Sequence, residues 1–144
     1  MEDKALGLLG LMRRAGAVQI GEDKAFDAIP SGKVKVLLLS EDASERACRR
    51  AEAMTNGRRF LLVTTHYPRE TLGQALGVGS CAVAAVTDLG FANALMKELS
   101  AQLPARYGAF AEETARRSDK AERRRRETAE RKGGKRNVKR RTEA

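Results

Sequence analysis

Apolar and polar positions along residues 4–103 follow two different periods, which predict helices and strands in turn. Apolar residues three and four positions apart indicate amphipathic helices, whereas short unbroken apolar runs indicate buried strands. Strands that alternate with helices are typical of an α/β domain, in which helices cover both faces of a central sheet. The runs 34–39 and 60–63 are apolar at nearly every position, so we expect both to be buried and 34–39 to lie inside the sheet. The helical pattern covers 4–14, 22–29, 43–54, 68–76 and 89–99, and the strand pattern covers 18–20, 34–39, 60–63 and 81–86.

Turn and capping residues mark where these elements begin and end. Gly16 follows the first helix, as is common after a helix C-terminus. Asp42 followed by Glu45 has the order of a capping box at the start of the third helix. Asp88 is expected to cap the last helix of the domain, because aspartate is a favoured N-cap residue.

The periodic pattern ends at Pro104, which divides the chain into a domain, residues 1–103, and a tail, residues 104–144. Past Phe110 the tail has almost no large apolar residues, so we expect it to be disordered or transiently helical. Acid and base pairs four positions apart favour a solvated helix as far as Lys132, which Gly133-Gly134 should end. The pairs are Glu112 with Arg116, Glu113 with Arg117, Glu122 with Arg126 and Glu127 with Arg131.

The net charge of +9 is concentrated in the tail. Residues 104–144 contain 15 Lys and Arg against 7 Asp and Glu, whereas residues 1–103 contain 13 against 12. Arginine runs neutralise nucleic-acid phosphates irrespective of sequence. Two other interpretations stay open, a tail that only keeps the chain soluble and a tail that holds an acidic partner protein. The basic residues concerned are Arg123, Arg124, Arg125, Arg126, Lys135, Arg136, Lys139, Arg140 and Arg141.

Composition argues against several other classes of protein. No apolar run is long enough to cross a bilayer, and the N-terminus lacks the order of a secretory signal, so we expect a cytoplasmic protein without membrane contact. Aromatic residues make up only 4% of the chain and tryptophan is absent, which argues against a stacking platform for single strands. We expect a monomer.

Few residues offer catalytic or metal-binding chemistry. Cys48, Cys81 and the single His66 are too few and too far apart for a zinc site, and both cysteines are expected to be buried. The glycines of 76–80 precede a strand rather than a helix, which excludes a dinucleotide-binding loop. We therefore predict no catalytic residue, metal, cofactor or small-molecule substrate. A small enzyme that uses His66 remains the alternative.

The segment VQIGEDKAF, residues 18–26, ends a strand at Gly21 and begins a helix with Glu22 and Asp23. Acidic residues in a first helical turn stabilise the helix dipole by about 0.3 to 1 kcal/mol each, which is a sufficient structural reason for both. A second interpretation is functional. Carboxylates accept hydrogen bonds from base amino groups, while free backbone N–H groups and Lys24 can face phosphate. Composition leaves both open.

Three strings and their spacing resemble the bacterial YlxQ-like branch of the ribosomal kink-turn RNA-binding protein superfamily. They are LGLMRRAGAVQIGED, VKVLLLSEDAS and TLGQALGVGSCAVAAVTDLGFANAL, and the resemblance covers residues 4–100. It implies a three-layer α/β/α sandwich with a four-stranded mixed sheet, to which this chain adds a basic C-terminal tail. It also implies a non-catalytic protein that recognises structured, kink-turn-like or ribosomal RNA, with a link to the ribosome, translation or transcription.

The resemblance also implies where RNA would bind. By position, Gly21, Glu22, Asp23 and Lys24 would read the groove at tandem sheared G·A pairs. The loop of Gly77, Val78, Gly79 and Ser80 would cover a flipped-out nucleotide, and the turn 40–43 would lie beside them. The chain departs from the superfamily pattern, because Asp23 replaces the usual asparagine, Lys24 the usual glutamate and Asp27 the usual lysine.

Overall fold

The computed structural model describes the backbone of residues 3–143 and the side chains of residues 3–132. Helices and strands alternate as the sequence pattern predicts. The elements are α1 (Lys4–Ala15), β1 (Val18–Ile20), α2 (Glu22–Ala28), the 3-10 helix η1 (Ile29–Ser31), β2 (Val36–Leu39), α3 (Glu45–Met54), β3 (Leu61–Thr64), α4 (Arg69–Ala75), β4 (Val83–Val86), α5 (Leu89–Gln102) and α6 (Pro104–Glu143).

The four strands form one mixed sheet in the order β1-β4-β2-β3. Strands β2 and β3 are parallel, whereas β4 is antiparallel to both β1 and β2. Every residue of β2 is buried, which confirms the predicted interior position. The prediction that the run 60–63 is also buried is wrong in part, because β3 lies at the edge of the sheet and Leu61 and Leu62 are only half-buried.

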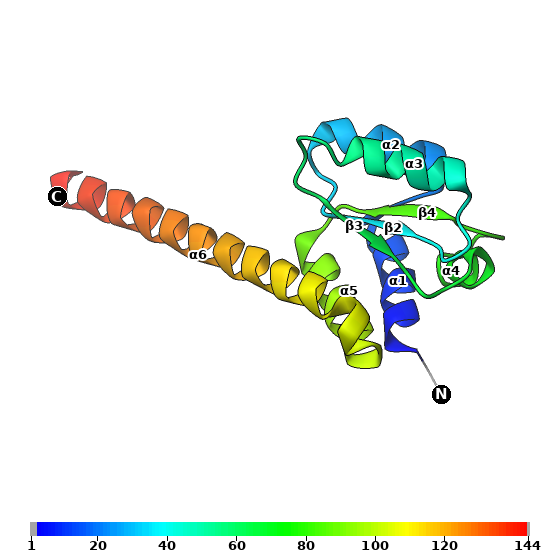
Figure 1. The fold of residues 1–144 in the computed structure, drawn as a ribbon. Helices are drawn as coiled ribbons and strands as arrows, with labels where there is room; N and C mark the ends of the chain where they lie inside the picture. Colours follow the sequence, from blue (N-terminus) through cyan, green and yellow to red (C-terminus); the bar gives the residue numbers. More distant parts are fainter. Residues whose placement is uncertain (1–2, 144) are drawn as a thin grey trace.

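Helices cover both faces of the sheet and form a three-layer α/β/α sandwich, which confirms the expected fold class (Figure 1). Helices α2 and α3 lie on one face, and α1, α4 and α5 lie on the other. Because side chains alternate along a strand, β2 contributes to both cores. Leu37 packs with Phe26 of α2 on one face, and Leu38 packs with Leu9 of α1 on the other.

The helix caps are partly those expected. Asp88 caps α5 by accepting a hydrogen bond from the Phe91 N–H, as predicted. Asp42 does not cap α3. That position belongs to Ser44, whose hydroxyl accepts from the Ala47 N–H at 3.1 Å. The Asp42 carboxylate instead accepts from the Arg69 N–H at 2.9 Å, and this backbone hydrogen bond lowers the pKa of Asp42 below its usual value.

The folded part of the chain extends beyond the boundary expected at Pro104. In the first turns of α6, the side chain of Tyr107 is fully buried and Thr114 is 1% exposed. Arg106 donates to the Thr64 carbonyl at 2.9 Å, and Arg117 donates to the Arg59 carbonyl at 2.6 Å. Helix α6 therefore runs antiparallel to β3 and covers the outer edge of the sheet, a position that would otherwise be open to another strand.

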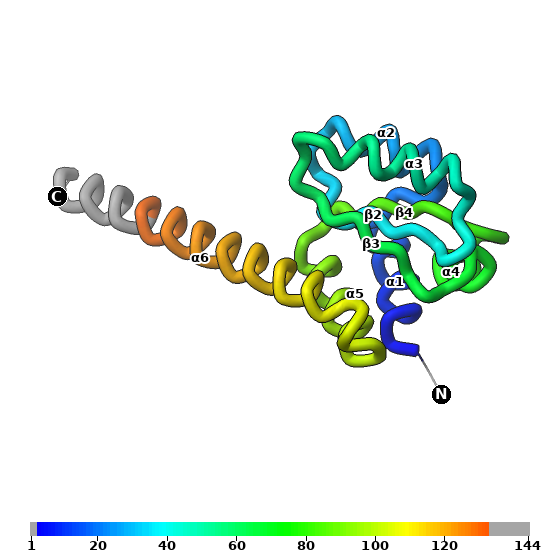
Figure 2. Tube along the Cα trace, viewed as in Figure 1, coloured from blue at the N-terminus to red at the C-terminus, as the bar shows by residue number. Residues whose placement is uncertain are grey.

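Beyond these turns, α6 projects away from the domain (Figure 2). Two of the predicted four-apart ion pairs form, Glu113 with Arg117 at 2.9 Å and Glu122 with Arg126 at 3.8 Å. Arg116 pairs with Glu113 rather than with the expected Glu112. The helix end predicted at Gly133-Gly134 is wrong, because α6 continues to Glu143. The side chains of the basic residues after Gly134 lie outside the described ones. Within the described chain, no helix is long and apolar enough to cross a bilayer.

Candidate nucleic-acid interface

Gly21 forms the junction between β1 and α2. Its N–H donates to the Val83 carbonyl and its carbonyl accepts from the Ala25 N–H, both at 2.9 Å. Its backbone has φ 98° and ψ 157°, a conformation that is essentially restricted to glycine. This geometry lets the strand end and the helix begin without an intervening loop. The glycine is therefore required by the local backbone, whatever the segment binds.

The two acidic residues after Gly21 lie in different surroundings. The Glu22 carboxylate is 3.8 Å from the Arg50 guanidinium on α3, and Arg50 also lies over the Phe26 ring at 4.4 Å. Asp23 and Lys24 are exposed to solvent. Within the described residues, no side chain caps the N-terminus of α2, so its first N–H groups are free for an acceptor.

The loop Gly77–Ser80 is exposed along its whole length. Gly77 has φ 73° and lies against the Arg13 guanidinium, so a side chain there would be strained and would displace Arg13. The Val78 N–H donates to the Gly73 carbonyl at 2.8 Å, which ties the loop to α4. Val78 is one of the few exposed large apolar side chains, at 37% exposure. The loop thus presents an apolar contact on a rigid turn.

Strand directions bring these segments to one end of the sheet. Because β4 is antiparallel to β1 and β2, the loop before β4 lies at the same end as the residues that follow β1 and β2. The Ser40 N–H donates to the Ala82 carbonyl, next to the Gly21 hydrogen bond to Val83, both at 2.9 Å. We call this end, with Gly21–Lys24, Ser40–Ala43 and Gly77–Ser80, the loop end. The predicted site residues of the domain are therefore neighbours.

Four acidic side chains lie at the loop end close to the sheet, and Lys24, Arg13, Arg50 and Arg69 lie beside them. Glu22, Asp23, Glu41 and Asp42 gather there. Arg50 and Arg69 pair with two of them across distances of 3.8 and 3.4 Å, with both partners of each pair partly exposed. Exposed pairs of this kind contribute little stability and are screened by salt. The exposed carboxylates of this end can accept hydrogen bonds from base amino groups, and Lys24 can face a phosphate.

The predicted basic residues of the tail are well separated from the loop end. Arg123, Arg124, Arg125 and Arg126 are exposed on α6, and only Arg126 forms an ion pair with a described residue. Lys135, Arg136, Lys139, Arg140 and Arg141 lie outside the residues with described side chains.

His66 has a structural environment that the sequence did not reveal. Its N–H donates to the Tyr107 hydroxyl at 2.8 Å, and its Nδ1 lies 2.6 Å from the same oxygen. The imidazole also packs against the Tyr67 ring, with centroids 4.1 Å apart and the ring planes tilted by 35°. His66 is half-buried, and its hydrogen bonds to Tyr107 fasten α6 to the loop between β3 and α4.

The cysteines and acidic residues form no second chemical centre in the described chain. Cys81 is buried, and burial raises the pKa of its thiol, so it stays protonated and unreactive at neutral pH. Cys48 is only half-buried, which differs from the expectation for both cysteines. Among the described residues, no group of three His, Cys, Asp or Glu side chains could hold a metal ion.

Sequence reasoning missed the part of α6 that belongs to the domain. The sequence does contain a helical pattern there, because Tyr107, Phe110, Ala111 and Thr114 are three or four positions apart. Tyr107 packs into the core beneath α5, and Phe110 and Ala111 pack against the same cluster. Two aromatic residues among many charged ones were too few to stand out in the pattern.

No protein-family model matches the chain. The chain is 37% identical over 92 residues to the RNA-binding protein YlxQ of Bacillus subtilis (strain 168), a match that covers 64% of this chain and 91% of the relative. The structure of a protein with unknown function from Bacillus halodurans C is also similar, with a TM-score of 0.64 and 29% sequence identity. That similarity covers 69% of this chain and 99% of the other.

Proposed function

The chain belongs to the YlxQ family, and on that premise we propose that it is a non-catalytic RNA-binding protein that recognises structured RNA. The observation that carries the proposal is the convergence of Gly21–Lys24 and Gly77–Ser80 at the loop end, each held by a conformation that glycine allows. The named relative is an RNA-binding protein, which supports the same class of ligand.

The exposed groups of the loop end suit a folded RNA with accessible base edges. Asp23 accepts hydrogen bonds but cannot donate them, so it fits a guanine amino group and not a carbonyl. Lys24 supplies a positive charge for a nearby phosphate, and Val78 supplies an apolar surface for an unstacked base. Sequence-specific RNA recognition generally uses such unpaired or splayed bases. We infer ribosomal or kink-turn-like RNA in the bacterial cytoplasm, bound by a monomer.

The test compares two RNAs that differ only at the pairs to be read. One hairpin carries tandem G·A pairs beside a bulge, and the other carries G·C pairs at the same positions. Asp23→Ala and Lys24→Ala are expected to reduce the preference for the first hairpin, because base contacts specify and phosphate contacts position. Fluorescence anisotropy at fixed salt measures both affinities.

Matched controls separate base reading from a general change in charge. Glu52→Ala removes a carboxylate from the exposed C-terminal half of α3, and Lys97→Ala removes an ammonium from the exposed face of α5. Neither should change the ratio of the two affinities. If Asp23→Ala and Lys24→Ala leave that ratio at the parent value, the acidic pair serves only to begin α2.

The basic tail is proposed to add affinity for any RNA. A deletion that starts at Pro104 would remove the buried Tyr107, so the tail must be cut later. A chain that ends at Ser118 keeps the packing of Tyr107 and Thr114 and the hydrogen bond of Arg117 to the domain. The slope of log affinity against log salt concentration should be smaller for this chain. The decrease should be about 0.7 for each phosphate of a single-stranded RNA that the tail no longer neutralises. An unchanged slope would show that the tail does not touch RNA.

A further inference from the structure

A cleft of about 820 Å³ lies at the opposite end of the sheet from the loop end. One wall is the face of α6 that is turned toward the sheet, and the other is formed by the segments that enter β2 and β3. Its base is apolar, with Ile29, Val34 and Phe60 all nearly buried. We call it the basic cleft, defined by Lys35, Arg58, Arg59, Arg117, Lys120 and Arg124.

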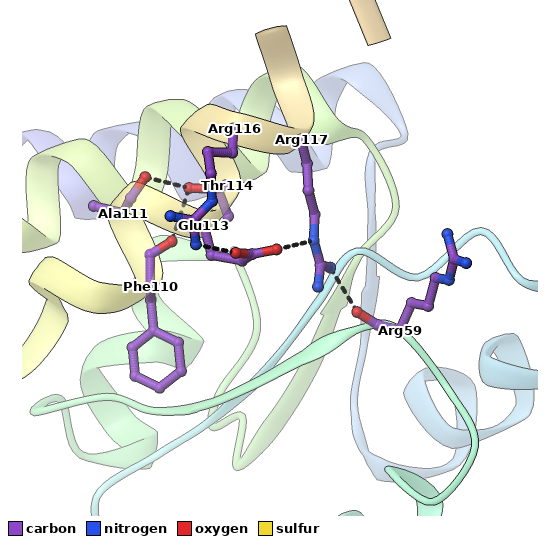
Figure 3. A network of polar contacts seen from close by, with 7 residues as sticks. All are labelled: Arg59, Phe110, Ala111, Glu113, Thr114, Arg116 and Arg117. Carbon is purple, nitrogen blue, oxygen red and sulfur yellow. Dashed lines mark hydrogen bonds and ion pairs between the residues drawn. The ribbon is translucent and has the colours of Figure 1, made fainter. Parts of the chain in front are cut away.

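The two walls are fastened together by charged side chains. Glu113 accepts from Arg116 and, at 2.9 Å, from Arg117. The Arg117 guanidinium also donates to the Arg59 carbonyl at 2.6 Å, so it spans from α6 to the strand edge (Figure 3). The hydrogen bonds from Arg116 and Arg117 lower the pKa of Glu113, which stays ionised at neutral pH. The shape of the cleft is thus set by interactions within the chain.

Most of the positive charge in the cleft has no counter-charge. Seven of the lining residues are basic, and Glu113 is the single acidic one. Like charges held close together repel one another, which is unfavourable unless an anion joins them. A site of this kind is built for a ligand with several negative charges. Five basic side chains form no ion pair within residues 3–132, namely Lys35, Arg58, Arg59, Lys120 and Arg124.

The arrangement fits a polymer better than a small phosphate compound. Arg117, Lys120 and Arg124 follow one face of α6 over about 10 Å, at 1.5 Å per residue. A row of that length can face roughly three successive steps of a nucleic-acid strand. The lining offers no exposed aromatic side chain for a base, since Phe60 is 8% exposed. These groups suit phosphates and not base edges.

We propose that the basic cleft is a second RNA-binding surface, which holds the sugar-phosphate backbone independently of sequence. The inference rests on the proposed RNA binding and assigns a separate part of it to this surface. Ser40 follows Lys35 by five positions along β2, and five steps of about 3.3 Å place the basic cleft about 17 Å from the loop end. The loop end selects the RNA, and the basic cleft adds salt-sensitive affinity beside that of the rest of the tail.

The experiment compares two double variants with the same change in charge. Lys35→Gln with Lys120→Gln removes two ammonium groups from the basic cleft. Lys4→Gln with Lys97→Gln removes two exposed ammonium groups outside it, on α1 and α5. Affinity for two unrelated structured RNAs is measured between about 50 and 300 mM salt, and thermal melting checks that all proteins are folded.

The cleft variant is expected to lose affinity for both RNAs by the same factor. Its salt slope should fall by roughly 1.4 to 1.8, at about 0.7 to 0.9 for each phosphate neutralised, whereas the control keeps the parent slope. Equal slopes in the two variants would overturn the inference while leaving the loop end as the RNA site. A parent protein that binds no RNA would overturn both proposals. Polyglutamate is added as a competitor at the same concentration of charge as the RNA. If it displaces the RNA, the cleft is assigned to an acidic protein segment, which would also overturn the inference of an RNA-binding cleft.

Discussion

Tyr107→Ala tests whether the first turns of α6 are part of the folded domain. The side chain is fully buried between α6 and the core, and its hydroxyl contacts the backbone N–H and Nδ1 of His66. Removing a buried aromatic ring costs about 3 to 5 kcal/mol in comparable cores. That is a large fraction of the total free energy of unfolding of a small domain, about 5 to 15 kcal/mol.

Urea denaturation followed by circular dichroism measures the effect. With a slope of about 2 kcal/mol per molar urea, the midpoint should fall by roughly 2 M. Tyr107→Phe keeps the ring and loses only the hydroxyl, so the His66 N–H is left without its acceptor at a cost of about 1 to 3 kcal/mol. We expect this variant to lie between the parent and Tyr107→Ala.

Leu11→Ala provides the control for loss of an apolar side chain from the surface. Leu11 is 46% exposed on α1, and its removal should cost less than about 1 kcal/mol. If Tyr107→Ala unfolds at the same urea concentration as Leu11→Ala, the start of α6 does not pack on the domain. The basic cleft would then lose one of its walls.

Three further changes test other parts of the molecule. Gly21→Ala forces a side chain into a backbone conformation reserved for glycine and should cost about 1 to 3 kcal/mol, so an unchanged urea midpoint would contradict the geometry of the β1–α2 junction. Gly73→Ala would place a Cβ 2.5 Å from the Ser80 Cα, so the loop before β4 must move. We expect faster hydrogen exchange in that loop and weaker selective RNA binding. Unaltered exchange would contradict the close packing of Gly73 on the loop. Burial acts to raise the pKa of Asp3, but hydrogen bonds such as that from Tyr67 outweigh it and hold the pKa below its usual value. The ionised Asp3 carboxylate therefore stabilises the fold at pH values above its unfolded-state pKa. This stabilisation is lost as the pH falls through the folded-state pKa. Asp3→Asn should therefore flatten the fall in melting temperature between about pH 5 and pH 2, and parallel curves for parent and variant would argue against the contribution.

The regular elements of the domain were largely predictable because their signals are local. Apolar runs and helical spacing identified all four strands and the five helices of the sandwich. Gly16 and Asp88 were recognised as a helix end and a helix start, since capping depends on residues three or four positions apart. Asp42 was misread because its partner, Arg69, is distant in sequence and only the fold brings the two together.

The candidate site was predictable as segments but not as an arrangement of charge. Residues 1–103 are almost neutral on average, yet the fold gathers acidic side chains at the loop end. It gathers unpaired basic side chains, including Lys35 and Arg59, at the opposite end beside α6. Composition cannot reveal such a separation, because it depends on which strand ends meet. The basic cleft could not be foreseen from any contiguous stretch.

The amino-acid sequence by itself determined the order of helices and strands, the glycine at the end of β1 and the concentration of basic residues after Pro104. The first two features depend on hydrophobic periodicity and backbone conformation, which act over a few neighbouring residues. The third depends only on composition. Tertiary structure decided the strand order, the neighbours of His66 and the extent of the domain along α6. Those features depend on interactions between distant residues. Tyr107, for example, is buried only because the edge strand β3 and helix α5 lie where its side chain can reach them.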